Sequence, residues 1–253
     1  MPEPLEHPWR LVLLGAPGVG KGTQADLLTR RIGACHLSTG DVFRHAKSRG
    51  GHEQTLAMSA ALHFMSRGAL VPDAILWDMM RERKNCLRCC GGFVLDGFPR
   101  TLAQAQTLKV LLEGEKVSLD AVVNYELPVT EIVARLSGRR SCEKCRAIFH
   151  LTSQPSRTQG VCDHCGGALF QREDDRPEAI AVRLEVYASN TAPLIEFYQK
   201  LGLLIPVLAT GSPEEIFERT IAALPARSQS ARSRPQPKPL PESQPDAALA
   251  RLG

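Results

Sequence analysis

The sequence has no long apolar stretch: a run of about 18 apolar residues, the usual sign of a membrane-spanning helix, occurs nowhere. Residues 1–10 contain proline and mixed charge, and they lack the apolar centre of a secretory signal. These absences predict a cytoplasmic protein with no membrane partner. Hydrophobic residues still make up 43% of the chain, which suffices for a buried core.

Strong charge of one sign is also missing from most of the chain. The net charge is +4, and residues 225–253 hold five basic and two acidic residues, or +3, which leaves +1 for residues 1–224. We therefore expect no nucleic-acid partner. The same C-terminal stretch contains six prolines and no aromatic residue, so it cannot bury enough apolar surface to fold, and we predict a disordered tail at 225–253.

The chain contains eight cysteines, and without an export signal these are more typical of metal binding or of reduced thiols than of disulfides. Four of them form two Cys-x-x-Cys pairs separated by sixteen residues: Cys142, Cys145, Cys162 and Cys165. This spacing predicts a tetrahedral site for structural Zn2+. Four thiolates leave no open position, so the metal should not activate water. The alternative is four unrelated thiols.

A glycine-rich run, Gly15–Gln24, follows the apolar segment Leu11–Leu14 and precedes residues with helical periodicity. Its glycines allow backbone N–H groups to point at an anion, and Lys21 adds a mobile positive charge. A strand, loop and helix in this order predict a cradle for nucleotide phosphates. An ordinary glycine-rich turn is the alternative interpretation.

Apolar strand candidates alternate with longer amphipathic segments, which predicts an α/β fold with a parallel sheet flanked by helices. The five predicted strands are Leu11–Leu14, His36–Ser38, Phe93–Leu95, Val122–Tyr125 and Leu204–Leu208, the last with Pro206 only at a sheet edge or strand end. Helices are predicted over 21–31, 41–48, 54–66, 73–83, 103–112, 130–139, 178–200 and 213–224. Two regions, about 41–80 and 140–172, interrupt the alternation and are predicted to be insertions.

Asp96 follows the predicted strand Phe93–Leu95 directly. Ligands of doubly wound sheets bind at the carboxyl ends of the strands, so a carboxylate there can hold Mg2+ through water. The alternative is that Asp96 only caps a turn.

Taken together, these residues resemble the adenylate kinase family in its long, zinc-bearing bacterial form, over about residues 9–222. The signatures are Gly15–Gln24, Leu37–Arg44, Gly92–Thr101 with Gln104, Arg135 with Arg139 and Arg140, the four cysteines, and Arg172–Asp175 with Arg183. The resemblance implies a P-loop NTPase-type five-stranded parallel sheet within a kinase domain at 9–224. It also implies an inserted AMP-binding domain at about 41–71 and a zinc-containing lid at about 138–175.

The resemblance further implies roles for individual residues. ATP would be held by Gly18, Val19, Gly20, Lys21, Gly22 and Thr23, with Arg135 on its base and Ser212 in contact through its backbone. AMP would be held by Thr39, Arg44, Gly97, Arg100, Gln104, Arg172 and Arg183, with Thr39 and Gln104 near the adenine. The catalytic set would be Lys21, Arg100, Arg139, Arg172 and Arg183, which lie around the transferred phosphoryl group.

The implied activity is reversible, Mg2+-dependent transfer of a phosphoryl group from ATP to AMP, giving two ADP by direct in-line attack. The acceptor phosphate is already an anion at neutral pH, so no general base is needed, and arginines can stabilise the anionic transition state. Two alternatives remain open at this point: a kinase of another nucleoside monophosphate, and a zinc-ribbon binding module with a P-loop as scaffold. We expect a monomer.

Overall fold

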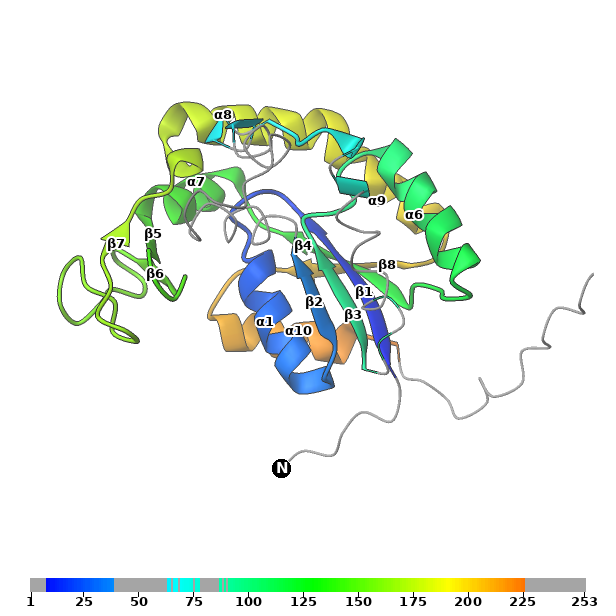
Figure 1. Cartoon of the computed structure of the whole chain (residues 1–253), viewed down its shortest axis with the longest axis horizontal. Coiled ribbons are helices and arrows are strands. Elements are labelled where there is room, and N and C mark those ends of the chain that lie inside the picture. The colour runs from blue at the N-terminus through cyan, green and yellow to red at the C-terminus, as the bar shows by residue number, and fades with distance from the viewer. Residues whose placement is uncertain are drawn as a thin grey trace, which may run out of the picture.

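The computed structural model describes residues 8–38, 63–64, 66–67, 69–74, 76–77, 87, 89 and 91–225. Its centre is a five-stranded parallel sheet in the order β2-β3-β1-β4-β8 (Figure 1). The strands are β1 (Trp9–Gly15), β2 (Cys35–Ser38), β3 (Gly92–Asp96), β4 (Ala121–Glu126) and β8 (Leu204–Leu208). All five predicted strands are confirmed, with ends that differ by two residues at most.

Strand β1 lies in the middle of the sheet, with β3 on one side and β4 on the other. In register, Leu13 of β1 pairs with Asp96 of β3 and with Val123 of β4. The winding direction of the chain changes beside β1, and this is the point where such sheets bind ligands. The carboxyl ends of β1 and β3 therefore deliver the glycine loop and Asp96 to the same edge.

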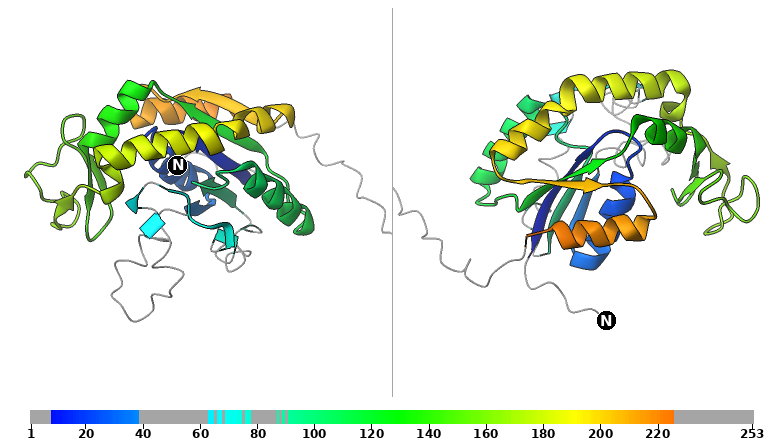
Figure 2. Two further views of the ribbon diagram at one scale, coloured as in Figure 1. Left: turned by 90° about the horizontal axis from the view of Figure 1, so that it is seen from above. Right: turned by 180° about the vertical axis from the view of Figure 1, so that it is seen from behind.

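Helices cover both faces of the sheet (Figures 1 and 2). One face packs against α1 (Lys21–Ile32) and α10 (Pro213–Ala223), and the other against α6 (Leu102–Gly114) and α9 (Pro193–Lys200). Alternate residues of β1 supply the two cores: Leu11 and Leu13 face one, and Val12 and Leu14 face the other. Burial on both faces explains why β1 is an almost continuous apolar run.

Pro206 lies inside β8, which is an edge strand of the sheet. Proline cannot donate a hydrogen bond to a neighbouring strand, so an edge position tolerates it. The prediction for this strand is confirmed.

The region after α7 (Val129–Gly138) forms a second, antiparallel sheet in the order β6-β5-β7, with β5 (Arg139–Cys142), β6 (Ile148–His150) and β7 (Leu169–Phe170). The short helix η1 (Glu173–Asp175) then leads into α8 (Pro177–Val186). This small sheet projects away from the main sheet in Figure 1. Its three strands were not predicted from the sequence.

The predicted helix over 178–200 is wrong in one respect. It is divided into α8, a π-helical turn η2 (Tyr187–Thr191) and α9, because Pro193 cannot continue a regular helix. The helices predicted over 41–48, 54–66 and 73–83 lie mostly outside the described residues, as does the 41–71 insertion. Residues 226–253 of the predicted tail lie outside them too.

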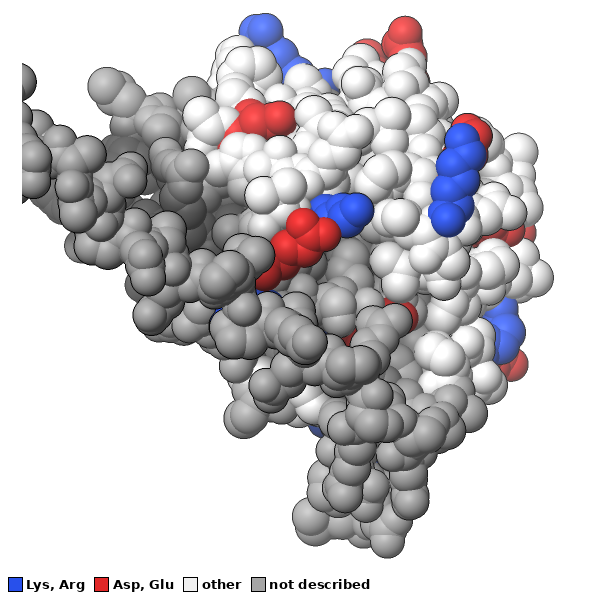
Figure 3. Space-filling view, turned by 90° about the vertical axis from the view of Figure 1, so that its right-hand side faces the viewer, with Lys and Arg blue, Asp and Glu red and all other residues white. Residues whose placement is uncertain are grey.

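Charged side chains of both signs are scattered over the face that carries α6 and α9 (Figure 3). Lys109 is 4.0 Å from Glu113 on α6, and Lys200 is 2.6 Å from Glu196 on α9. Among the described residues, this face therefore presents no single-sign field. Within the described part of the chain, no helix is long and apolar enough to cross a membrane.

Candidate active site

The loop between β1 and α1 can be formed only with glycine at several positions. Gly15, Gly18 and Gly20 have φ values of 133°, 85° and 101°, a region that other residues rarely adopt. A Cβ atom on Gly15 would lie 2.5 Å from the Tyr125 carbonyl oxygen, and one on Gly18 would lie 2.7 Å from Leu136. The backbone of the loop therefore packs directly against Tyr125 and Leu136.

Helix α1 begins at the end of this loop. Gly20 is its N-cap, no side chain caps the helix, and its first turn contains no acidic residue. At the other end, Gly33 adopts a left-handed conformation and Arg30 and Arg31 lie in the last turn, which suits the helix dipole. The positive end of the helix thus faces the loop, as the sequence predicts for a phosphate site.

Lys21 lies across the loop. Its Nζ atom donates hydrogen bonds to the carbonyl oxygens of Gly15 at 2.7 Å and of Ala16 at 2.9 Å. This position keeps the ammonium group directly beside the backbone that is predicted to hold phosphate.

Burial lowers the pKa of Lys21 to about 8, and this is the largest influence on it. The Asp96 carboxylate opposes that change, whereas the positive charges of Arg100, Arg183 and Arg139 add to it. The pKa of Lys21 is thus affected by the carboxylate of Asp96 and by three arginines that belong to the predicted catalytic set.

Asp96 stands at the end of β3, next to the first turn of α1. Its Oδ2 atom is 3.5 Å from the place where a Cβ atom on Gly22 would lie, and 3.9 Å from His36 Nε2. The other ring nitrogen of His36 is 3.3 Å from Asp26. A carboxylate oxygen beside a phosphate loop is the kind of ligand that Mg2+ prefers, so the residues present fit that ion.

Arg100 is fixed by its surroundings. Its Nε atom donates to the carbonyl oxygen of Gly97 at 2.7 Å, and its backbone N–H donates to Gln104 Oε1 at 2.7 Å. Gln104 is 1% exposed, and its amide also donates to Asp73 at 2.6 Å. The predicted adenine contact of Gln104 would have to use the remaining hydrogen-bonding capacity of this amide.

Arg139, on strand β5 of the small sheet, and Arg183, on α8, meet at one carboxylate. Arg139 donates two hydrogen bonds to Asp175, at 2.7 and 2.5 Å, and Arg183 Nη1 lies 3.1 Å from Asp175 Oδ1. The same Arg183 atom is 3.1 Å from Asp174 Oδ2. Asp175 is 0% exposed, so one buried carboxylate fixes the relative position of the two guanidinium groups.

Asp175 has no role in the sequence interpretation, although it belongs to a signature quoted there. The run of three acidic residues directly after Arg172, Glu173–Asp175, could have suggested an ion-pair partner for nearby arginines. Arg172 itself donates through Nε to Ser141 Oγ at 2.7 Å, which holds it against β5.

Arg135, on α7, bridges two loops. It donates to the Ala209 carbonyl oxygen at 2.8 Å and to that of Val19 at 3.4 Å. Ser212 is the N-cap of α10: its Oγ accepts from the Glu215 N–H, and its own N–H donates to the Glu215 carboxylate. The Ser212 side chain is thus engaged in the cap, and a nucleotide contact through its backbone stays a prediction.

The four predicted metal ligands lie together in the small sheet. The Sγ atoms of Cys142, Cys145, Cys162 and Cys165 are all within 4.8 Å of one another, and the pairs 142–165 and 145–162 are 3.5 Å apart. Zinc–sulfur bonds of about 2.3 Å in a tetrahedron place the sulfurs about 3.8 Å apart, so this cluster fits the ion. A Cβ atom on Gly167 would lie 2.9 Å from Cys142 Sγ, which explains the glycine at that position.

The pKa values of the Cys142 and Cys145 thiols change in opposite directions. For Cys142, burial raises the pKa, but the backbone N–H groups of Cys145 and Lys144 and the neighbouring thiols outweigh it, and the pKa is lowered to about 6. For Cys145, the Ala147 N–H lowers the pKa, but burial and the other three thiols raise it to about 12. Ligand groups this close repel one another when charged, and a bound cation removes that repulsion.

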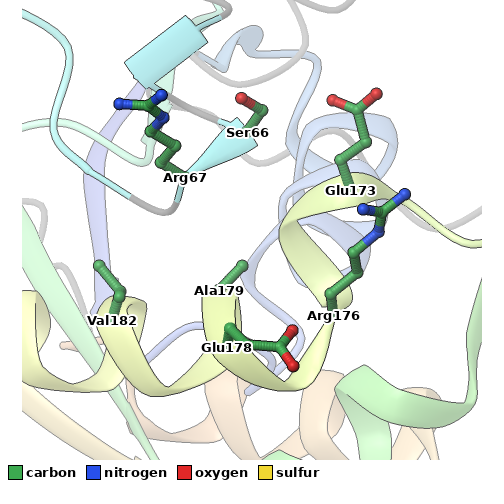
Figure 4. A pocket seen from close by; sticks show the side chains of 7 residues that line it. All are labelled: Ser66, Arg67, Glu173, Arg176, Glu178, Ala179 and Val182. Carbon is green, nitrogen blue, oxygen red and sulfur yellow. The ribbon is translucent and has the colours of Figure 1, made fainter.

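A hollow of about 400 Å³ lies between residues 66–67 and the start of α8 (Figure 4). Its lining residues are Ser66, Arg67, Glu173, Arg176, Glu178, Ala179 and Val182. None of them is predicted to contact a nucleotide, although Ser66 and Arg67 fall in the predicted AMP-binding insertion and Glu173 falls in the predicted lid. The charged residues among them are of both signs. Thr39 and Arg44, predicted to hold AMP, lie outside the described residues.

A glycine loop after the central strand, with Lys21, Asp96 and arginines from separate elements around it, defines the class: P-loop phosphotransferases that act on nucleotides. The family model for adenylate kinase matches residues 13–203. The chain belongs to the adenylate kinase family.

Curated relatives agree with this assignment. The adenylate kinase of Thermodesulfovibrio yellowstonii is 46% identical over 215 residues, which are 85% of this chain and 98% of the relative. That of Carboxydothermus hydrogenoformans is 45% identical, with 82% and 95% covered, and that of Streptomyces griseus is 43% identical, with 87% and 99% covered. The protein is accordingly a nucleoside monophosphate kinase that converts ATP and AMP reversibly into two ADP.

Proposed function

We propose that phosphoryl transfer takes place between the phosphate loop at 18–23 and the Arg100 segment, with Arg139, Arg172 and Arg183 around the transferred group. The observation that supports this assignment is that Lys21 lies across the glycine loop, with Asp96 at the end of β3 beside the first turn of α1. Arg139 and Arg183 are held together by Asp175, and their positive charges, with that of Arg100, add to the lowering of the Lys21 pKa.

In the proposed step, an oxygen of the AMP phosphate attacks the γ-phosphorus of ATP. A new P–O bond forms while the bond between that phosphorus and the β–γ bridging oxygen breaks, leaving one ADP on each side. The attacking oxygen is already ionised, so no residue has to remove a proton. Lys21 and the arginines supply positive charge where negative charge is spread in the transition state.

Asp96 would hold Mg2+ through water, and the ion would neutralise charge on the donor phosphates. Arg135, between the loops that contain Val19 and Ala209, would lie against the donor base. Arg100 would bind the acceptor phosphate, with Gly97 beside it. Thr39, Arg44 and Gln104 would complete the AMP site.

The four-cysteine cluster would hold structural Zn2+. The apolar cluster around it contains only Cys142, Phe149 and Cys162, with Ala147 and Leu169 at its edge. So small a core contributes little to stability, and a tetrahedral thiolate site would supply the rest. We place the lid at about 138–175.

We expect a functional monomer. We expect it in the cytoplasm, where thiols stay reduced and available to a metal. Sedimentation of the purified protein at working concentration tests the oligomeric state.

The experiment that tests the function is phosphoryl transfer from Mg-ATP to AMP, UMP, CMP and GMP, measured side by side. We expect a strong preference for AMP, and a loss of about 100-fold or more in kcat/KM in Arg100→Ala. Arg157→Ala is the matched control, since Arg157 lies in the lid and uses its backbone N–H, not its side chain, to contact Asp163. A preference for another acceptor, or salt-sensitive oligonucleotide binding without turnover, would contradict the proposal.

A further inference from the structure

The helical path from α8 to α9 contains a π-helical turn, Tyr187–Thr191, beside the proposed acceptor site. Its wide hydrogen bond joins the Ala192 N–H to the Tyr187 carbonyl oxygen at 2.8 Å. Pro193, which has no N–H, follows directly and begins α9. Figure 1 shows α8 and α9 in succession above the sheet. Such turns insert an extra residue into a helix and frequently occur at functional sites.

Thr191 is the last residue of this turn, and it is 8% exposed. Its Oγ1 atom donates a hydrogen bond of 2.9 Å to the carbonyl oxygen of Arg100, which is 91 residues away in sequence. Three helical threonines in the described residues use their hydroxyl groups differently: Thr29, Thr107 and Thr220 each donate to the carbonyl four residues earlier in their own helix. Thr191 instead connects two distant segments.

The connection is made at a residue whose backbone is held from both sides. The Arg100 N–H donates to Gln104 Oε1 at 2.7 Å, and its carbonyl accepts from Thr191. The helical path that contains Thr191 also contains Arg183, eight residues earlier, which is held by Asp175. Through Thr191, the backbone of one arginine is thus anchored to the helix of another.

We propose that Thr191 is a positioning residue for the acceptor phosphate. Its hydroxyl group fixes the backbone of Arg100 relative to the helix of Arg183, so that both guanidinium groups meet the nucleotide in a constant arrangement. This inference rests on the proposed function, which places Arg100 on the AMP phosphate. Thr191 is the residue at which the π-turn ends, and from there its hydroxyl group reaches the Arg100 carbonyl oxygen.

The test compares Thr191→Val, which keeps the shape and removes the hydroxyl, with Thr191→Ser, which keeps the hydroxyl. Thr191→Val should raise KM for AMP about two- to tenfold, the effect of one hydrogen bond, and leave KM for ATP within about twofold. Thr191→Ser should restore the KM for AMP. The matched control is Thr220→Val, because Thr220 is also buried and bonds to Tyr125 on the opposite side of the sheet; it should lower only the melting temperature.

Equal changes in both KM values, or a Thr191→Ser variant as impaired as Thr191→Val, would overturn the inference. If Thr191→Val does not fold, Thr191→Ala is compared with Thr191→Ser by the same criteria. Arg100→Ala is measured in parallel. If it raises KM for AMP and the Thr191 variants do not, the inference alone fails; if it leaves KM for AMP unchanged, the assignment of Arg100 fails and the inference fails with it.

Discussion

The phosphate loop and the proposed cysteine-bearing lid are supported in different ways. The loop lies at the end of β1, a strand buried on both faces between two large apolar clusters. The lid consists of three strands of two to four residues around a cluster of three buried side chains. Apolar burial holds the first site in shape before any ligand arrives, whereas the second requires cross-links, which four thiolates and a metal can provide.

We expect the largest effect from removing the metal that the four cysteines are proposed to hold. We expect Cys142→Ser, or a chelator that strips the ion, to lose an apparent stabilisation of about 10 kcal/mol from the lid, while the main sheet stays folded. Limited proteolysis should then cut within residues 139–170 before it cuts elsewhere, and zinc content should fall. Cys89→Ser is the control, since Cys89 lies outside the cluster. Unchanged zinc content and melting in Cys142→Ser would contradict the structural-metal proposal.

Asp175 connects the proposed lid to helix α8, because it pairs with Arg139 of β5 and with Arg183 of α8. Asp175→Asn keeps the shape but takes from Arg139 the carboxylate with which it pairs, whereas Arg183 keeps the Asp174 carboxylate 3.1 Å away. Removing one partner of a buried pair costs about 3–5 kcal/mol. We expect lower thermal stability together with a fall in kcat of at least tenfold, because Arg139 loses its fixed position.

The control for that variant is Asp163→Asn, since Asp163 is an exposed lid carboxylate that contacts only the Arg157 backbone among the bonds described. It should leave kcat unchanged. A normal kcat in Asp175→Asn would show that the joint is structural and not part of the transfer site.

The pH dependence of Mg-ATP binding tests the role of Lys21 in the phosphate loop. Below pH 8 the buried amine is protonated and can bind phosphate as a cation; above its pKa of about 8 it is neutral, so affinity for Mg-ATP should fall as pH rises. The fall should approach about tenfold per pH unit at most. Binding titrations between pH 6.5 and 9.5 measure it, and Lys21→Met should bind weakly without this dependence. The same pH dependence in Lys21→Met would assign the titration to another group.

The smallest effect concerns the capping box of α10. Ser212→Ala removes the acceptor for the Glu215 N–H and should cost about 1 kcal/mol of stability. Because the nucleotide contact is predicted for the Ser212 backbone, KM for ATP should change less than twofold. A large rise in KM for ATP would show that the hydroxyl group itself takes part in binding.

Features that lie within one short segment could be predicted from the sequence, because such a segment specifies both its structure and its chemistry. Gly15–Gln24 predicted the phosphate loop because positive φ values, a helix start and a lysine are all encoded within ten residues. The four cysteines likewise predicted their own clustering, since two Cys-x-x-Cys turns favour one tetrahedral arrangement.

Structure that depends on segments far apart in the sequence, or on one extra residue in a helix, was not predicted. The strands β5, β6 and β7 were missed because segments of two to four residues are too short to show a strand periodicity, and these strands form only where β5 pairs with β6 and β7. The helix predicted over 178–200 did not include the π-turn at Tyr187–Thr191. The apolar periodicity over 23 residues changes little when one extra residue is inserted near Pro193.

The sequence by itself determined the parallel α/β fold, the phosphate loop, the cysteine cluster and the family. Each of these is specified by contiguous residues or by the spacing between residues. Only the tertiary structure decided how the arginines are held. Asp175 and Thr191 act on Arg139, Arg183 and Arg100 through bonds that cross from one element to another. Such bonds depend on where folding places two backbones, and no local pattern in either segment specifies that.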